Sequence, residues 1–195
     1  MLIIGNDANY SVAISRHDFF GKIVEYHSDG IGFWTKHGRH HPFLLTEYPF
    51  DKRTGGVRYH RNFAKMEFLQ HDAPHFSFIE LLNVPTIGNT GSDRGLFFRL
   101  LDRKHLQWLE HLIFSPQPKF VLVNQTLVRM IERISRHHNV LTRLSPLLKG
   151  TKPGAATLET NGTVIHNGYS FSHSVSNAYL SGLGQTIRSY IAAGR

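Results

Sequence analysis

The chain has 195 residues, a length that suits one domain with a single hydrophobic core. Hydrophobic residues make up 41% of it, too many for a disordered chain, and no apolar run approaches the roughly 20 residues that span a bilayer. There is no cysteine, which excludes disulfides, catalytic thiols, thiolate zinc sites and iron–sulfur clusters. The net charge of +8 favours a polyanionic partner, because binding would release counterions.

The N-terminus lacks the features of a secretory signal. The stretch Met1–Tyr10 has neither a basic segment nor a cleavage-site pattern, so we expect a cytoplasmic protein. Nothing in the sequence indicates a membrane contact, a cofactor or an obligate protein partner, and we expect a monomer.

Short β-prone segments alternate with helical patterns along the chain. The expected strands cover residues 1–4, 76–82 and 120–123, with a hairpin over 158–166 that turns at Asn161-Gly162. The expected helices cover residues 18–26, 60–70, 96–114, 127–137 and 180–193. Trp108, within the third of these, is expected to pack in the core.

The remaining segments are expected to be loops, of which residues 28–58 form the longest. That stretch is rich in Gly, His, Pro and aromatic residues and has no sustained period. The alternation of strands and helices predicts an α/β fold, a three-layer sandwich around a mainly parallel sheet, in a single domain. Because sites in such sheets lie at the carboxyl ends of the strands, the loops after Ile4, Leu82 and Val123 should face one crevice.

Polar residues that could take part in catalysis or binding follow the predicted strands. Asp7 comes just after the first strand, where a carboxylate could orient water or stabilise a cation, although taken alone it is better explained as an ordinary Asp/Asn turn. Asn83 follows the second strand and offers both a donor and an acceptor for a base edge. The segment Ser172–Asn177 surrounds His173 with hydroxyl groups, which suit phosphates.

A histidine cluster lies between these segments, in His37-Gly38-Arg39-His40-His41, with His60 nearby. Such a cluster raises the question of a metal site. There is no H-E-x-x-H pattern and no carboxylate at a supporting spacing, so phosphate contact is the more economical use, and we expect no metal.

Taken together, the order of these pieces resembles the uracil-DNA glycosylase superfamily. Members have a first strand ending in Gly-Gln-Asp-Pro-Tyr, a Gly-x-x-Phe segment, a strand ending in Leu-Leu-Asn, and a His-Pro-Ser-Pro loop. Mismatch-specific members add an Asn-Arg-Phe-Trp helix start. The corresponding segments here are Gly5-Asn6-Asp7-Ala8-Asn9, Gly30-Ile31-Gly32-Phe33-Trp34, Leu81-Leu82-Asn83, His173-Ser174-Val175-Ser176 and, more faintly, Arg61-Asn62-Phe63.

The resemblance covers most of the chain, and it rests on the order of the motifs rather than on any one of them. Both prolines of the histidine loop are absent, which puts its rigidity and its wedge residue in doubt. Asn9 replaces the tyrosine that, in uracil-specific members, blocks a substituent at the five-position of the pyrimidine. The smaller side chain would leave room there, and residues 26–59 could line an enlarged pocket.

The resemblance implies a DNA glycosylase that needs no cofactor or metal and that flips a base out of the duplex. Phe33 or Trp34 would stack on the base, Asn83 would pair with its edge, and Asn9 would border it. Asp7 would stabilise the sugar cation and position water, while His173 would donate to the base oxygen. The residues expected to hold DNA are Ser172, Ser174, Val175, Ser176, Asn177, Arg39 and Arg61.

The substrate and two rival functions stay open at this point. Uracil, in base-excision repair, is the family default. The absent gate favours a bulky five-substituted pyrimidine, such as the modified cytosines of some phage genomes, which would make the protein an antiviral glycosylase. The rivals are a non-catalytic nucleic-acid-binding module and a metal-dependent nuclease that uses the histidine cluster.

Overall fold

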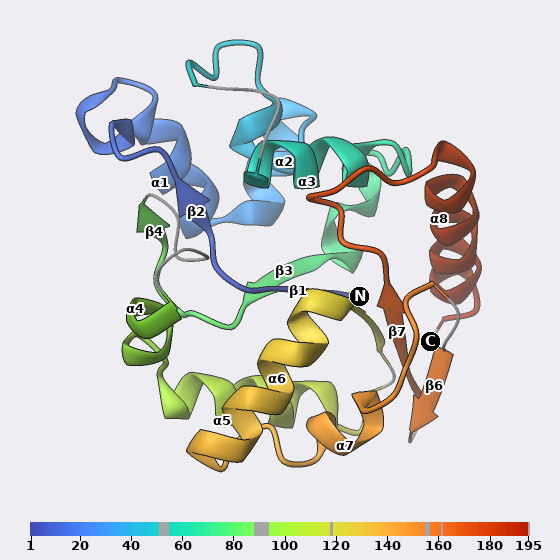
Figure 1. Cartoon of the computed structure of the whole chain (residues 1–195). Coiled ribbons are helices and arrows are strands. Elements are labelled where there is room, and N and C mark those ends of the chain that lie inside the picture. Colours follow the sequence, from blue (N-terminus) through green and yellow to red (C-terminus); the bar gives the residue numbers. More distant parts are fainter. Residues whose placement is uncertain (51–54, 88–93, 118, 155–156, 161, 195) are drawn as a thin grey trace.

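The computed structural model describes residues 1–50, 55–87, 94–117, 119–154, 157–160 and 162–194, and its centre is a five-stranded sheet (Figure 1). The strand order is β3-β1-β5-β7-β6, and each neighbouring pair is parallel except β7 and β6. The strands are β1 (Leu2–Gly5), β3 (Ser77–Glu80), β5 (Phe120–Asn124), β6 (Thr157–Thr160) and β7 (Thr163–Gly168). The predicted mainly parallel sheet is confirmed.

The central strands are buried on both faces, which is why they read as continuous apolar runs. In β1, Leu2 and Ile4 pack on one side of the sheet, while Ile3 between them packs on the other. In β5, Val121 and Leu122 divide between the two sides in the same way, because successive side chains of a strand point to opposite faces.

Helices cover both faces of the sheet (Figure 1). The first face carries α4 (Arg94–Arg99), α5 (Arg103–Ile113), α6 (Gln125–His138) and α7 (Leu144–Leu148). The second face carries α2 (Gly30–His37), α3 (Gly55–Ala64) and α8 (Asn177–Ala192). Among the described residues, no helix has both the length and the apolar character needed to cross a bilayer.

A third apolar cluster lies beyond the second face, around α1 (Phe20–Ser28) and the 3-10 turns η1 (Ile14–Arg16) and η2 (Pro42–Leu44). Its aromatic members include Tyr10, Phe33, Phe43 and Tyr48. Two short parallel strands, β2 (Asn9–Tyr10) and β4 (Thr86–Ile87), join this part to the segment that follows β3. The cluster therefore flanks the carboxyl ends of β1 and β3.

Residues 28–58 differ from the predicted long loop, because α2, η2 and the start of α3 lie within them. Asp29 caps α2 by accepting a hydrogen bond from the Gly32 backbone at 2.8 Å, and Gly38 ends the helix with a φ of 66°. The glycines of this stretch favoured a loop, whereas the caps at its ends define a helix. The expected helix over 60–70 lies earlier, in α3, and is followed by η3 (Gln70–His75).

The helix expected over 96–114 is two helices, since the chain leaves helical geometry between α4 and α5. Asp102 begins α5 as its cap and accepts hydrogen bonds from the backbones of Lys104 and His105. In α5, Leu106, Leu109 and Ile113 form the buried face, and Trp108 is 51% exposed. The prediction that Trp108 packs in the core is wrong, because this residue falls on the opposite face of the helix.

The predicted hairpin over 158–166 corresponds to the antiparallel pair β6 and β7. Of its predicted turn, Asn161 lies outside the described residues, and Gly162 has a φ of 75°. That positive φ is the conformation for which the glycine is suited.

Candidate functional site

A cavity of about 1180 Å³ lies at the carboxyl edge of the sheet. Its walls come from the segments that follow β1, β3, β5 and β7, and from α3 and η2. The crevice expected at the ends of the parallel strands is therefore present. Its volume lies above the range of about 300–1,000 Å³ that is typical of ligand pockets.

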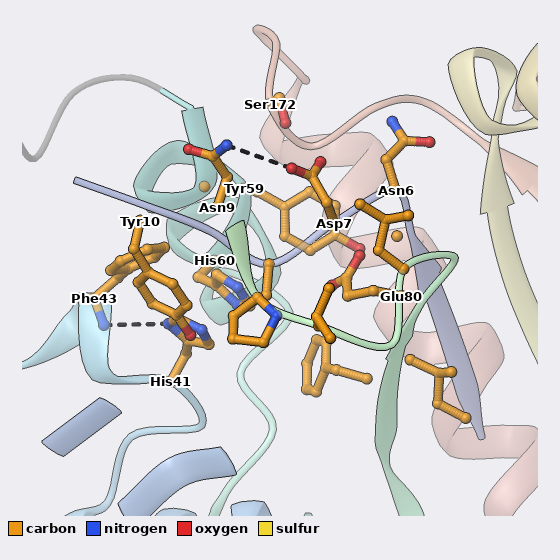
Figure 2. A pocket seen from close by; sticks show the side chains of 18 of the residues that line it. Asn6, Asp7, Asn9, Tyr10, His41, Phe43, Tyr59, His60, Glu80 and Ser172 are labelled. Atoms are coloured by element: carbon orange, nitrogen blue, oxygen red, sulfur yellow. Dashed lines mark hydrogen bonds between the residues drawn. The ribbon is translucent and has the colours of Figure 1, made fainter. Parts of the chain in front are cut away.

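Asp7 points into this cavity from the turn after β1 (Figure 2). Its Oδ2 accepts hydrogen bonds from the Thr86 hydroxyl at 2.8 Å and from Asn9 Nδ2 at 3.3 Å. Asn9 also donates to the Thr86 hydroxyl, at 3.3 Å. The pairing of β2 with β4 thus holds the carboxylate in one orientation. Asn9 also lines the cavity, and its side-chain amide is hydrogen-bonded to Asp7 and Thr86.

Glu80 supplies a second carboxyl group, which lies below Asp7 in Figure 2. It ends β3 and pairs in register with Gly5 of β1. A Cβ at position 5 would overlap the Glu80 carboxyl, so the group occupies this place because Gly5 has no side chain. Among the described residues, no hydrogen bond is made to the Glu80 carboxyl.

Burial raises the pKa of Glu80 to about 8, and the neighbouring Asp7 carboxylate adds to the shift. Glu80 is therefore a neutral acid at pH 7, beside a second carboxyl group in the same cavity. A carboxyl group whose environment favours its protonated form, placed beside a second carboxyl group, suits acid–base chemistry. The sequence analysis missed Glu80. The available signal was a charged residue inside the apolar run Phe78-Ile79-Glu80-Leu81-Leu82.

Aromatic side chains form the rest of the inner wall, among them Tyr10, Tyr26, Phe43, Tyr59 and Phe78. Burial raises the pKa of Tyr26 and Tyr59 well above the usual range, and the Glu80 carboxyl adds to both shifts. These two phenols are neutral at any ordinary pH. The wall therefore offers flat apolar surfaces and neutral donors, which suit an uncharged planar ligand.

Histidines continue this wall and are buried. The rings of His41 and His60 stack with centroids 3.6 Å apart, and both line the cavity. His40 lies behind them, with its Nε2 3.1 Å from His60 Nδ1. Burial lowers the pKa of all three, that of His60 to about 3, so they are neutral imidazoles in neutral solution.

This geometry does not suit a metal ion or a phosphate. In the described parts of the chain, no group of three or more His, Asp or Glu side chains is arranged to hold a metal. Because the three rings are buried and uncharged, they also lack the positive charge that phosphate contact would use. The phosphate role predicted for His40 and His41 does not fit their position.

The loop after β7 forms another side of the cavity, through Ser170, Ser172 and His173. Asn62, a buried residue of α3, holds this loop by donating to the backbone oxygens of Phe171 at 2.8 Å and His173 at 3.1 Å. His173 is exposed and borders the same cavity as Asp7, as the sequence predicts. These two hydrogen bonds from Asn62 restrain the loop after β7, which has no proline at the positions discussed above.

Asn83 also borders the cavity, at the end of the segment that follows β3. Its Nδ2 donates to Asp102 Oδ2 at 2.8 Å, next to the start of α5. This bond fixes the orientation of the amide. Asp7, Asn9, Asn83, Ser172 and His173 therefore surround one space, although they are far apart in the sequence.

Phe33 and Trp34 do not reach this space. Phe33 is 1% exposed in the third apolar cluster, and Trp34 is 4% exposed under the sheet. Both belong to α2 and not to a loop, so the stacking role predicted for them does not fit their position. Tyr10, Phe43 and His41 are the planar side chains that face the cavity instead (Figure 2).

The remaining predicted DNA contacts lie outside the cavity. Ser174, Ser176 and Asn177 are exposed, and the Ser176 hydroxyl caps α8 by accepting from the Tyr179 backbone at 3.2 Å. Val175 is half-buried against the core. Arg39 and Arg61 are exposed, and neither lines the cavity.

Comparison of the chain with protein-family models, with curated proteins and with solved structures gave no match.

Proposed function

We propose that this protein is a DNA glycosylase of uracil-DNA glycosylase type, a hydrolase that cleaves the N-glycosidic bond of a flipped base. The observation that carries the proposal is the pair of carboxyl groups, Asp7 and Glu80, in a cavity walled by aromatic rings. The Asp7 carboxyl group faces the place of the sugar, and the protonated Glu80 can donate to the leaving base, so the proposed reaction is written without a metal ion. The parallel sheet and the place of Asp7, Asn83 and His173 around one cavity agree with this assignment.

In the proposed reaction, the bond between C1′ of the sugar and the base nitrogen breaks, and its electron pair leaves with the base. The Asp7 carboxylate stabilises the sugar cation and accepts a proton from the water that attacks C1′. Glu80 delivers its proton to the departing base, and His173 donates a hydrogen bond to a base oxygen from the edge of the cavity. The products are the free base and an abasic site.

Binding would use the aromatic wall and the net charge. The edges of Tyr10, Phe43 and His41 border the space for the base, and Asn83 offers its amide to the base edge. The excess of 22 basic over 14 acidic residues attracts the phosphates of DNA. The protein is proposed to act as a monomer.

The cavity volume favours a pyrimidine with a bulky five-substituent over uracil. Such bases occur as the modified cytosines of some phage genomes, so the proposed role is antiviral. Excision of uracil in DNA repair is the alternative substrate assignment.

The test uses pure protein, EDTA and two labelled DNAs, one with uracil and the other with glucosylated hydroxymethylcytosine. Alkali then converts abasic sites to strand breaks. We expect breaks in the modified DNA alone, and none with the D7N variant. Breaks in the uracil DNA would assign the protein to repair, whereas intact DNA in both reactions would contradict the glycosylase proposal and favour a binding module.

Gly5→Ala tests the placement of Glu80 separately. The new methyl group overlaps the Glu80 carboxyl, which is the flexible end of a side chain, so the carboxyl moves and the sheet remains. We expect a fall of about a hundred-fold in excision rate, with a change of about 1 kcal/mol or less in the free energy of unfolding. Excision kinetics and urea unfolding measure the two effects. A variant with full activity would show that Glu80 need not lie beside Asp7.

A further inference from the structure

Trp108 is a large aromatic side chain that lies exposed beside the cavity and is not part of the buried core. It is 51% exposed and lines the cavity together with Asn83, Val84 and Pro85. The apolar face of α5 is complete without it, since Leu106, Leu109 and Ile113 are buried in the core. Its place at the border of the cavity lets the indole contact a ligand that extends out of that cavity.

A neighbouring ring supports the indole on one side. Trp108 stacks on His105, with ring centroids 5.6 Å apart and an interplanar angle of 30°. His105 in turn donates from Nε2 to the backbone oxygen of Glu80 at 2.8 Å. The indole is thus held, through one intervening ring, by the residue whose carboxyl group lies inside the cavity.

The exposed surface of α5 near Trp108 carries two basic side chains. Lys104 lies one turn before Trp108, so its side chain is on the same face of the helix, and Arg103 is next to it. Both are exposed, as are Gln107 and His111. An exposed aromatic ring among basic side chains is the combination that proteins use to bind single-stranded nucleic acid.

We propose that Trp108, with Lys104 and Arg103, is a stacking platform for an unpaired base next to the nucleotide that enters the cavity. This inference rests on the proposed function, and it adds a binding position that the flipped base does not use. Stacking on a neighbouring base would hold the strand open, and it tolerates any sequence because every base has a flat face.

The protein contains two tryptophans, which makes the test direct. Trp34 is 4% exposed, so the emission that acrylamide quenches comes from Trp108. We expect an oligothymidylate, which holds no base for excision, to quench this emission. An oligonucleotide of abasic residues, with the same phosphates, should leave it unchanged. Loss of the quenching in Trp108→Phe, with Trp34 emission retained, identifies the residue and reports that the variant is folded.

Affinity for the oligothymidylate gives the second measurement. Trp108→Ala should bind about ten-fold more weakly, since one stacked base contributes about 1–3 kcal/mol and about 1.4 kcal/mol is ten-fold. The matched control is Phe20→Ala, because Phe20 is also an exposed aromatic residue on a helix but does not line the cavity.

Unchanged affinity in Trp108→Ala, or equal quenching by the abasic oligonucleotide, would overturn the platform. The two proposals fail separately, since the titration requires no catalysis. Quenching by bases in a protein that excises none would support the platform and contradict the glycosylase. Excision by a protein whose Trp108 emission is not quenched by bases would support the glycosylase and contradict the platform.

Discussion

The D7N variant is expected to release bases at least about a hundred-fold more slowly than the wild type, while remaining folded. The amide has the shape of the carboxylate and can still accept a hydrogen bond from Thr86, which lies 2.8 Å from Asp7 Oδ2. It carries no charge to stabilise the sugar cation and takes no proton from water. Single-turnover excision with excess enzyme measures the chemical step without product release.

The matched control is D18N, because Asp18 is exposed, does not line the cavity and undergoes the same change of charge. It should excise at the wild-type rate, which separates the role of Asp7 from the effect of net charge on DNA binding. If D7N and D18N proved equally active, Asp7 would have no part in the reaction and the proposed mechanism would be wrong.

The second large effect concerns pH and Glu80. The pKa of Glu80 is raised to about 8, and the protonated form is the one that donates to the base. The single-turnover rate of the wild type should therefore be constant well below pH 8 and fall as the pH rises through it. Glu80→Gln removes the proton donor, so its rate should be about a hundred-fold lower below pH 8. The difference between the two proteins should shrink above that pH.

The pH dependence of the free energy of unfolding gives an independent measurement of the protonation of Glu80. Between about pH 4.5 and 8 the native protein keeps the Glu80 proton, which the unfolded chain has released, so this group lowers the free energy of unfolding as the pH rises. In Glu80→Gln this contribution is absent, and urea unfolding at pH 5 and pH 8.5 detects it. An alkaline fall in activity that persists in the variant would assign the proton to another group.

The sheet could be predicted from the sequence because its central strands are buried on both faces. Such strands need continuous apolar runs, as in Phe120–Val123, and the rule on the carboxyl ends of parallel strands then gives the location of the cavity. The same rule brought Asp7 and Asn83 to one place, whereas the place of His173 was implied by the family resemblance. The first and last residues of the helices were harder to predict, because the capping residues Asp29 and Asp102 lie in stretches whose composition also suits loops.

The inner wall of the cavity could not be predicted, since it depends on side chains that are distant in the sequence. Phe33 and Trp34 have the composition of a stacking pair, yet the direction of α2 places them in the interior. Trp108 has the composition of a core residue, yet its position relative to Leu106 and Leu109 places it outside. The environment of Glu80 depends on the register that sets it beside Gly5, and register is a property of two strands together.

The buried histidines make the protein sensitive to acid. His40, His41 and His60 are neutral in the native state, and burial lowers the pKa of His60 to about 3, whereas an unfolded histidine titrates near 6.5. Below that pH the histidines of the unfolded chain bind protons, whereas the buried rings of the native protein stay neutral. Acid therefore lowers the free energy of unfolding. His41 and His60 belong to the wall of the cavity, so the region that would hold the base is also the one that mild acid destabilises.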